Sequence, residues 1–191
     1  PYCTELQISS ENPNFPPICL HTEAGQTVKL IGKIDRVDIC QDGDQLWVRV
    51  VDYKTNGKIF ELGNLLYGLD MQMLIYLFSL WENGGTRYGE VTPAGVLYLP
   101  AKSPVAAISP LADEAQAAGI RLKELKMNGL LIDDPAVVSA MEQEAAGVFI
   151  PAKLTAKGEF DSRSSSLASL VQFGQLKKRM EKLLTAMAES L

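Results

Sequence analysis

The stretch that decides the fold is residues 33–54, which read KIDRVDICQDGDQLWVRVVDYK. Both halves are rich in Val and Ile and alternate apolar with polar side chains, as half-buried β-strands do. Gly43-Asp44, between the halves, is a typical two-residue hairpin turn. With those two residues at the centre of the turn, Val37 lies opposite Val50. The stretch therefore predicts a β-hairpin with a defined register.

The open end of this hairpin gathers charged side chains. The register places Asp35 opposite Asp52 and Lys33 opposite Lys54, and alternation puts Asp52 and Lys54 in the apolar row of the second strand. Facing carboxylates repel each other, and burying one of them unpaired is costly. A divalent cation between them would offset this cost, because Mg²⁺ binds carboxylate, phosphate and water oxygens. The alternative is that both acids lie in water and pair with the two lysines.

Three motifs follow one another along the chain. G-x-x-D-R-x-D occupies residues 32–38, D-Y-K-T occupies 52–55, and Q-x-x-x-Y occupies 72–76, where a helix is predicted. A D-x-K pattern alone occurs by chance in many chains, but three motifs in this order are specific. Together they resemble the RecB-like branch of the PD-(D/E)xK nuclease superfamily. The resemblance implies an α/β fold with a restriction-endonuclease-like core, in which helices flank a mixed central β-sheet.

Further segments extend the resemblance over most of the chain. They are residues 67–72, 93–98, 126–131 and 162–166. They resemble the C-terminal nuclease domain of AddB-type proteins, the B subunits of ATP-dependent helicase/deoxyribonucleases. The resemblance implies processing of double-strand DNA ends for recombinational repair, together with a helicase/nuclease partner, the A subunit of the heterodimer. We expect one nuclease domain over residues 1–191, cut from a larger protein, since the chain begins with Pro1 rather than Met.

The activity implied by the resemblance is hydrolysis of DNA phosphodiesters with Mg²⁺ or Mn²⁺. Asp35, Asp52 and the backbone carbonyl of Tyr53 would hold the cation. A bound cation polarises the phosphate and makes hydroxide available near neutral pH. Lys54 would orient the attacking water or stabilise the charge that develops on the phosphate.

Three other residues are candidates for a role at the same site. Gln72 and Tyr76 share one helix face because they are four residues apart. Composition alone favours a core tyrosine beside an exposed glutamine, whereas the resemblance implies that both support the metal site. The resembling family also has a metal-binding histidine on an upstream helix. The single histidine, His21, falls on a predicted strand, so we expect it not to be a ligand.

Cys3, Cys19 and Cys40 are odd in number and widely spaced, which predicts neither a disulfide framework nor a C-x-x-C metal site. In the AddB-like family a 4Fe-4S cluster takes one cysteine ahead of the nuclease core and three after it. No cysteine follows Cys40, so the cluster expected in the parent protein cannot be completed from this chain. We expect three ordinary, partly buried thiols.

A formal net charge of −5 is unfavourable for a DNA-binding protein, because phosphate contacts need a positive surface. Lys33, Arg36 and Lys58 surround the predicted site and are the expected DNA contacts. The basic residues of 177–182 are more typical of a solvated helix face. We expect weak metal and DNA binding, and slow or no cleavage, from this chain alone. Without a membrane-spanning apolar run or a leader, a cytoplasmic location is expected.

Periodicity and chain breakers predict the remaining elements. Strands are predicted at 4–10, 18–22, 27–40, 46–54 and 94–100, and helices at 61–83, from 135 toward 146, and from 167 to 190. The polar stretch between 101 and 133 predicts a surface loop. Ser164–Ser166 are the predicted cap of the last helix, with Leu170, Val171 and Phe173 among its inward-facing residues.

Two other functions fit parts of this pattern. The first is a catalytically incomplete nuclease fold that serves as a scaffold or DNA-binding module for a helicase partner. The presence of Asp35, Asp52 and Lys54 argues against it, because a decayed site usually loses one of these residues first. The second is a Cas4-like or restriction-type nuclease that acts without a helicase. Residues 93–131 resemble the helicase-associated family more closely, which ranks this alternative lower.

Overall fold

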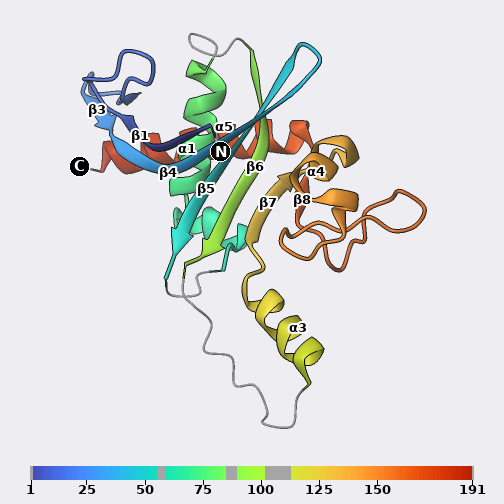
Figure 1. Cartoon of the computed structure of the whole chain (residues 1–191). Coiled ribbons are helices and arrows are strands. Elements are labelled where there is room, and N and C mark those ends of the chain that lie inside the picture. The colour runs from blue at the N-terminus through green and yellow to red at the C-terminus, as the bar shows by residue number, and fades with distance from the viewer. Residues whose placement is uncertain (1, 56–58, 85–89, 102–112, 191) are drawn as a thin grey trace.

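A computed structural model of the chain describes residues 2–55, 59–84, 90–101 and 113–190. Its main sheet has six strands in the order β1-β4-β5-β6-β7-β8, and β2 and β3 form a separate two-stranded sheet (Figure 1). The strands are β1 (Cys3–Ile8), β2 (Ile18–His21), β3 (Thr27–Leu30), β4 (Gly32–Asp42), β5 (Gln45–Lys54), β6 (Val91–Pro100), β7 (Asn128–Ile132) and β8 (Leu167–Ala168). The helices are η1 (Leu62–Tyr67), α1 (Gln72–Asn83), α3 (Glu114–Glu124), α4 (Pro135–Met141), η2 (Gln143–Ala145) and α5 (Leu170–Glu189).

The predicted hairpin is confirmed as β4 and β5. Asp42 pairs with Gln45 and Val37 pairs with Val50, so the turn and the register are as the sequence predicts. β5 then pairs with β6 in parallel, whereas β1 with β4 and β6 with β7 are antiparallel. The sheet is therefore mixed and flanked by helices, which confirms the expected α/β class.

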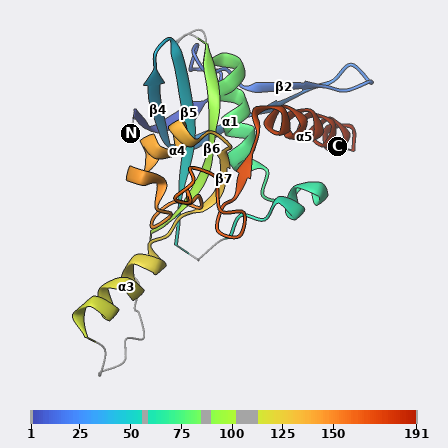
Figure 2. The ribbon, with the colours of Figure 1, turned by 90° about the vertical axis from the view of Figure 1, so that its right-hand side faces the viewer.

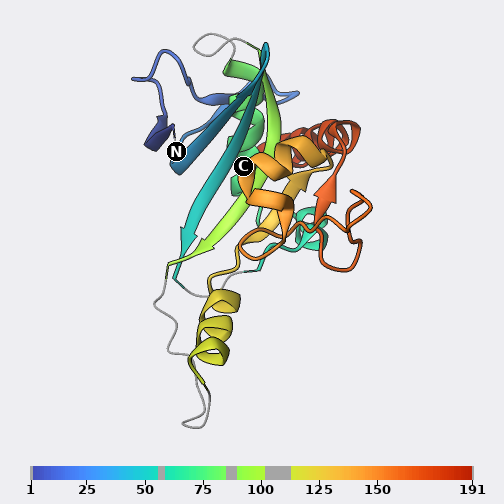
Figure 3. The same cartoon turned by 45° about the vertical axis from the view of Figure 1, so that its right-hand side comes forward.

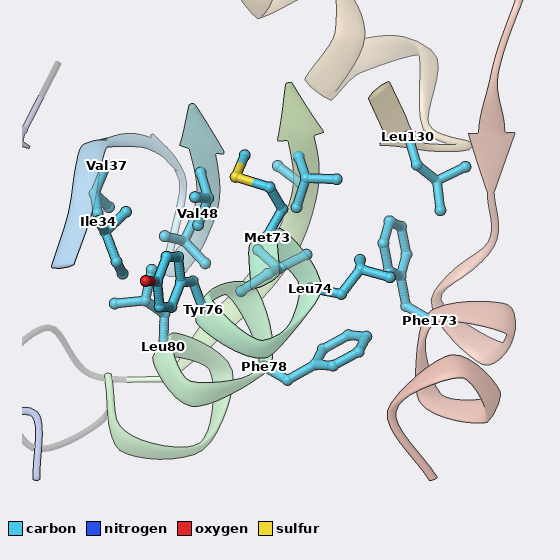
Figure 4. Packing of buried hydrophobic residues seen from close by; sticks show 14 of the residues in the cluster. Ile34, Val37, Val48, Met73, Leu74, Tyr76, Phe78, Leu80, Leu130 and Phe173 are labelled. Carbon is cyan, nitrogen blue, oxygen red and sulfur yellow. The ribbon is translucent and has the colours of Figure 1, made fainter. Parts of the chain in front are cut away.

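Helices cover both faces of the sheet. Figure 2 shows α1 and α5 on one side of the sheet and α4 on the other. The larger apolar cluster lies between the sheet and α1 and α5, and Figure 4 shows Leu74 of α1 facing Phe173 of α5. A second cluster, which includes Val51 and Val138, lies on the α4 face. Because Val50 belongs to the first cluster and Val51 to the second, successive β5 residues face alternate layers.

The predicted helix over 61–83 is wrong in its continuity. A 3-10 helix ends at Tyr67, and α1 begins only at Gln72. Between them Gly68 and Asp70 have φ values of 74° and 57°, a left-handed conformation that no α-helix accommodates. The apolar spacing runs through this break because both helices face the same core, so periodicity alone does not reveal it.

Two further predictions are corrected. The strand predicted over 27–40 is two strands, because Thr27–Leu30 pairs with β2 and only the part from Gly32 onward joins the main sheet. The surface loop predicted between 101 and 133 contains α3 and β7. Asp113 begins α3 with a capping box that Gln116 completes. In Figure 3 α3 projects away from the sheet, beyond the ends of β5 and β6.

The last helix also begins later than predicted. Ser169, not Ser164–Ser166, caps α5, and Gln172 completes its capping box. Phe173 is fully buried, but Leu170 and Val171, which the sequence predicts to face inward, are largely exposed. The helix predicted from residue 135 begins there as α4, with Asp134 as its cap, but it ends at Met141 rather than near residue 146. No helix in the part of the chain that the structure describes is long and apolar enough to cross a membrane.

Alanine substitutions at two glycines are expected to change the stability in opposite directions. A Cβ on Gly129, at φ +156°, would lie 2.0 Å from the Val96 carbonyl oxygen, whereas one on Gly174 of α5 meets nothing within 4 Å. Gly129→Ala is therefore expected to lower the free energy of unfolding by about 2–3 kcal/mol. Gly174→Ala is expected to raise it by about 0.5–1 kcal/mol, because alanine is the better helix former. Urea unfolding followed by circular dichroism measures both changes, and equal effects would contradict the β6–β7 packing.

Candidate active site

The ladder between β4 and β5 ends just before the predicted site. Its last pair is Arg36 with Val51. Beyond that pair the Asp35 side chain takes the place of a backbone partner. Its Oδ2 accepts a hydrogen bond of 3.0 Å from the Tyr53 backbone N–H. β5 meanwhile remains paired with β6 as far as Lys54. The two hairpin strands therefore separate at this end, and an acidic side chain occupies the gap.

The separation coincides with an irregularity in β4. Ile34 and Val37 both belong to the core on the α1 side, although residues three apart in a regular strand point to opposite faces. The alternation is therefore broken at Asp35 and Arg36. On the neighbouring strand β1, Glu5 has a φ of 57° at the same level. The expected direct pairing of Asp35 with Asp52 is thus replaced by a contact of Asp35 with the β5 backbone.

Asp52 and Lys54 lie together at the end of β5, as alternation predicts. Asp52 is only 7% exposed. The Lys54 Nζ lies 2.5 Å from Asp52 Oδ2. That oxygen is buried and receives no hydrogen bond of ordinary geometry from the described residues. A buried carboxylate with one close cation and no directed donor is an unusual arrangement in a folded core.

Tyr98 of β6 adjoins this pair. It is the strand partner of Asp52, and the Lys54 ammonium lies 5.4 Å from the centre of its ring. Burial raises the pKa of Tyr98 to about 12, and the negative charges of Asp70 and Asp52 add to the effect. The phenol is therefore neutral throughout the physiological pH range.

Gln72 and Tyr76 lie on one face of α1 as predicted, and the Gln72 amide donates a hydrogen bond of 3.0 Å to the Tyr76 hydroxyl. Tyr76 is buried, and Figure 4 shows its ring beside Ile34. A Cβ on Gly32 would lie 2.5 Å from the Tyr76 hydroxyl oxygen. The glycine of the first motif thus makes room for the tyrosine of the third, three residues before Asp35.

The expected DNA contacts differ in their surroundings. Lys33 forms a largely exposed ion pair of 3.0 Å with Glu5 rather than lying opposite Lys54. Lys58 lies outside the described residues. Arg36 binds Asp38 through two hydrogen bonds of 2.7 and 3.0 Å. The pKa of Arg36 is raised by this hydrogen bond and further by Tyr53.

Asp38 is held by a second arginine as well. Arg49 donates two hydrogen bonds to Asp38 Oδ2, at 3.1 and 2.6 Å. Both guanidinium groups border a cavity of about 170 Å³ that α4 residues line on the other side. Arg36 is therefore part of an ion-pair cluster on the α4 face. This position gives no support to the prediction that Arg36 contacts DNA beside the candidate site.

The cysteines and the histidine lie elsewhere. The structure contains no disulfide among Cys3, Cys19 and Cys40. Cys19 and Cys40 are exposed, so the expectation of partial burial is correct only for Cys3. His21 is exposed on β2, where its Nδ1 lies 3.1 Å from the Thr27 hydroxyl oxygen.

Comparison with known proteins identifies the family of the chain. Residues 3–190 match the family model of the PD-(D/E)XK nuclease superfamily. The chain therefore belongs to that superfamily, and its mixed six-stranded sheet with flanking helices is consistent with the restriction-endonuclease-like fold.

Curated relatives narrow the comparison. The chain is 35% identical over 184 residues, 95% of its length, to the B subunit of the ATP-dependent helicase/deoxyribonuclease of Acetivibrio thermocellus. It is 35% identical over 197 residues, 100% of its length, to the protein of the same name from Symbiobacterium thermophilum. A third, from Clostridioides difficile strain 630, is 32% identical over 187 residues. The chain spans only 16% of the length of each of these relatives.

The sequence did not single out three residues that adjoin the site. Tyr98 lies beside Lys54, the Phe60 ring lies 6.3 Å from that of Tyr98, and Asn128 Oδ1 accepts a hydrogen bond of 2.6 Å from the Phe60 N–H. Tyr98 belongs to a continuously apolar strand, so the sequence does not distinguish it from ordinary core residues. The contact of Phe60 with Asn128 joins residues 68 positions apart, which no local pattern predicts.

The Asp38 cluster predicts a dependence of stability on pH. Burial alone would raise the pKa of Asp38, but hydrogen bonds from Arg36 and Arg49 outweigh it and hold the pKa below the ordinary 3.8. This carboxylate therefore stabilises the fold above about pH 4, and the stabilisation is lost as pH falls through the lowered pKa. Asp38→Asn is expected to lower the free energy of unfolding at pH 7 by about 3 kcal/mol, because two partly buried guanidinium groups lose their counter-ion.

The measurement is urea unfolding of the wild type and Asp38→Asn between pH 3 and 7. The difference in free energy of unfolding between the two proteins should become smaller toward pH 3. Asp44→Asn in the exposed hairpin turn removes the same charge and should change stability little at any pH. A gap that stays constant down to pH 3 would show that the charge of Asp38 does not stabilise the fold.

Proposed function

We propose that this chain is the nuclease domain of the B subunit of an ATP-dependent helicase/deoxyribonuclease, and that it hydrolyses DNA phosphodiesters with Mg²⁺. One observation carries the proposal: the buried carboxylate of Asp52 lies beside Lys54 where β4 and β5 separate. The names of the relatives, which include both helicase and deoxyribonuclease, supply the larger context.

The residues at this point fit a divalent cation. Asp52 Oδ2 is buried, and its close partner among the described residues is the ammonium of Lys54. Asp35 lies in the adjoining gap. The Tyr53 N–H points into the same gap, and in a β-strand the carbonyl of a residue leaves on the same edge as its N–H. Asp35, Asp52 and the Tyr53 carbonyl would therefore hold Mg²⁺ or Mn²⁺ with three oxygen ligands.

The cation, when bound, polarises the phosphate and lowers the pKa of a bound water. Lys54 is held at the same place by Asp52 and by the ring of Tyr98. Its ammonium would orient the attacking water or stabilise the negative charge that develops on the phosphate in the transition state. The hydrogen-bonded pair of Gln72 and Tyr76 would brace the start of β4 ahead of Asp35.

This function requires two binding partners, which are DNA and a helicase/nuclease partner, the A subunit of the heterodimer. With a net charge of −5, the chain offers little long-range attraction for DNA. Lys33 and Lys58 would contact the strand locally, and the remaining length found in the relatives would supply most of the binding. The same proposal includes a 4Fe-4S cluster in the parent protein, whose full set of cysteines this chain does not contain, and a cytoplasmic location.

Lys54→Ala and Asp52→Asn test the proposal in the full-length gene product assembled with its helicase/nuclease partner. Each is expected to lower Mg²⁺-dependent release of nucleotides from linear duplex DNA by a factor on the order of 10² or more, because transition-state stabilisation is lost. DNA-dependent ATP hydrolysis should stay close to that of the wild type, since it does not use these residues.

Lys29→Ala, at an exposed lysine of β3, is the matched control and should leave both activities unchanged. Full nuclease activity in Lys54→Ala would overturn the proposal. It would instead favour a nuclease fold that serves only as a scaffold for the helicase.

A further inference from the structure

The Lys54 side chain has two neighbours of different kinds. On one side is the carboxylate of Asp52, and on the other is the ring of Tyr98, whose centre lies 5.4 Å from the ammonium nitrogen. An ammonium within about 6 Å of an aromatic centroid is attracted to the ring face. Tyr98 is 2% exposed, so little water competes for that contact.

We propose that Tyr98 is a positioning residue for Lys54, and that Phe60 and Asn128 hold its ring in place. We call these three residues the lysine shelf. The inference rests on the proposed function for its catalytic consequence, but its geometry is independent of it.

Lys54 needs a second contact because Asp52 has two roles in the proposed site. Asp52 is the close ionic partner of Lys54 and also a proposed oxygen ligand of the cation. A carboxylate shared with a doubly charged ion attracts a neighbouring ammonium less strongly. The contact with the ring does not weaken in this way, because Tyr98 is not among the proposed ligands of the metal ion. Tyr98 would therefore keep Lys54 in place when Asp52 is otherwise engaged.

The Tyr98 ring is itself held in place by Phe60 and Asn128. Phe60 lies 6.3 Å from Tyr98, centroid to centroid, with the ring planes inclined by 51°. This is within the range of favourable aromatic pairs. The Phe60 N–H is fixed by a hydrogen bond of 2.6 Å to Asn128 Oδ1, and Asn128 is the strand partner of Tyr98 on β7. The lysine shelf thus connects the segment that follows β5 to β7.

Two substitutions separate this role from simple core packing. Tyr98→Phe keeps the ring and removes only the hydroxyl, whereas Tyr98→Leu keeps an apolar side chain and removes the ring. Leu97→Ala is the control, because Leu97 is equally buried on the same strand but faces the α4 side. If Tyr98 only filled the core, Tyr98→Leu and Leu97→Ala would cleave DNA equally well when their stabilities are matched.

The first measurement is DNA cleavage by the full-length gene product with its helicase/nuclease partner. Tyr98→Leu is expected to lower kcat about three- to thirtyfold, the range that loss of a cation–π contact implies. KM for DNA should change less than twofold, because the shelf does not bind the strand. Tyr98→Phe should stay within twofold of the wild type, and Asn128→Ala should fall between the two. A Tyr98→Leu variant as active as Leu97→Ala would overturn the proposal.

The second measurement does not depend on activity or on metal. Reductive ¹³C-methylation of lysines retains their charge, and the Lys54 signal is the one that Lys54→Arg removes. Ring currents should shift this signal upfield in the wild type and in Tyr98→Phe, but not in Tyr98→Leu. An unshifted signal in the wild type would overturn the shelf. If Lys54→Ala cleaves DNA normally, the proposed function fails, and this signal alone decides whether the shelf exists.

Discussion

The site depends on the place where two paired strands part. β4 and β5 form a regular hairpin up to the pair of Arg36 with Val51, and beyond it the Asp35 carboxylate replaces the backbone partner of Tyr53. A continued ladder would engage the backbone groups of Tyr53 and leave no gap between the strands. Because β6 still holds the other edge of β5, the end of β5 remains fixed while the gap exists. Asp52 and Lys54 are therefore held by a strand that stays paired on its other edge, and Asp35 contacts that strand from β4.

The same place concentrates an electrostatic conflict that a stable fold normally avoids. Asp52 is 7% exposed and receives no directed hydrogen bond among the described residues, and its close partner is the ammonium of Lys54. Burying such a pair brings little net stability, since desolvation consumes most of the attraction. By contrast, Asp38 is satisfied by two arginines on the α4 face. The Asp38 cluster is therefore a well-satisfied structural ion pair, whereas the Asp52 pair is the one to which we assign the proposed reaction.

The sequence predicts the hairpin and its register because both depend on neighbouring residues. The turn at Gly43-Asp44 and the alternation on either side suffice to pair Val37 with Val50. The same logic puts Asp52 and Lys54 in one row. It fails at Asp35, because the break in alternation there involves a second strand, β1, with Glu5 at a φ of 57°. Local pattern contains no information about that partner.

The other differences have similar causes. The apolar period of residues 61–83 continues across Gly68 and Asp70, although the backbone there is left-handed. Ser169 lies three residues after the predicted cap, because β8 takes up Leu167 before the helix begins. Tyr98 could not be assigned to the site from the sequence, since its place there follows from its strand partner Asp52 and not from its neighbours in sequence.

The most direct test of the account is diffraction from crystals of the full-length gene product soaked in Mn²⁺, with data collected near the manganese absorption edge. The account predicts one anomalous peak within about 2.0–2.3 Å of oxygens from Asp35, Asp52 and the Tyr53 carbonyl, with Lys54 beside it. Peaks only at other carboxylates, with the gap between β4 and β5 empty at saturating Mn²⁺, would contradict it.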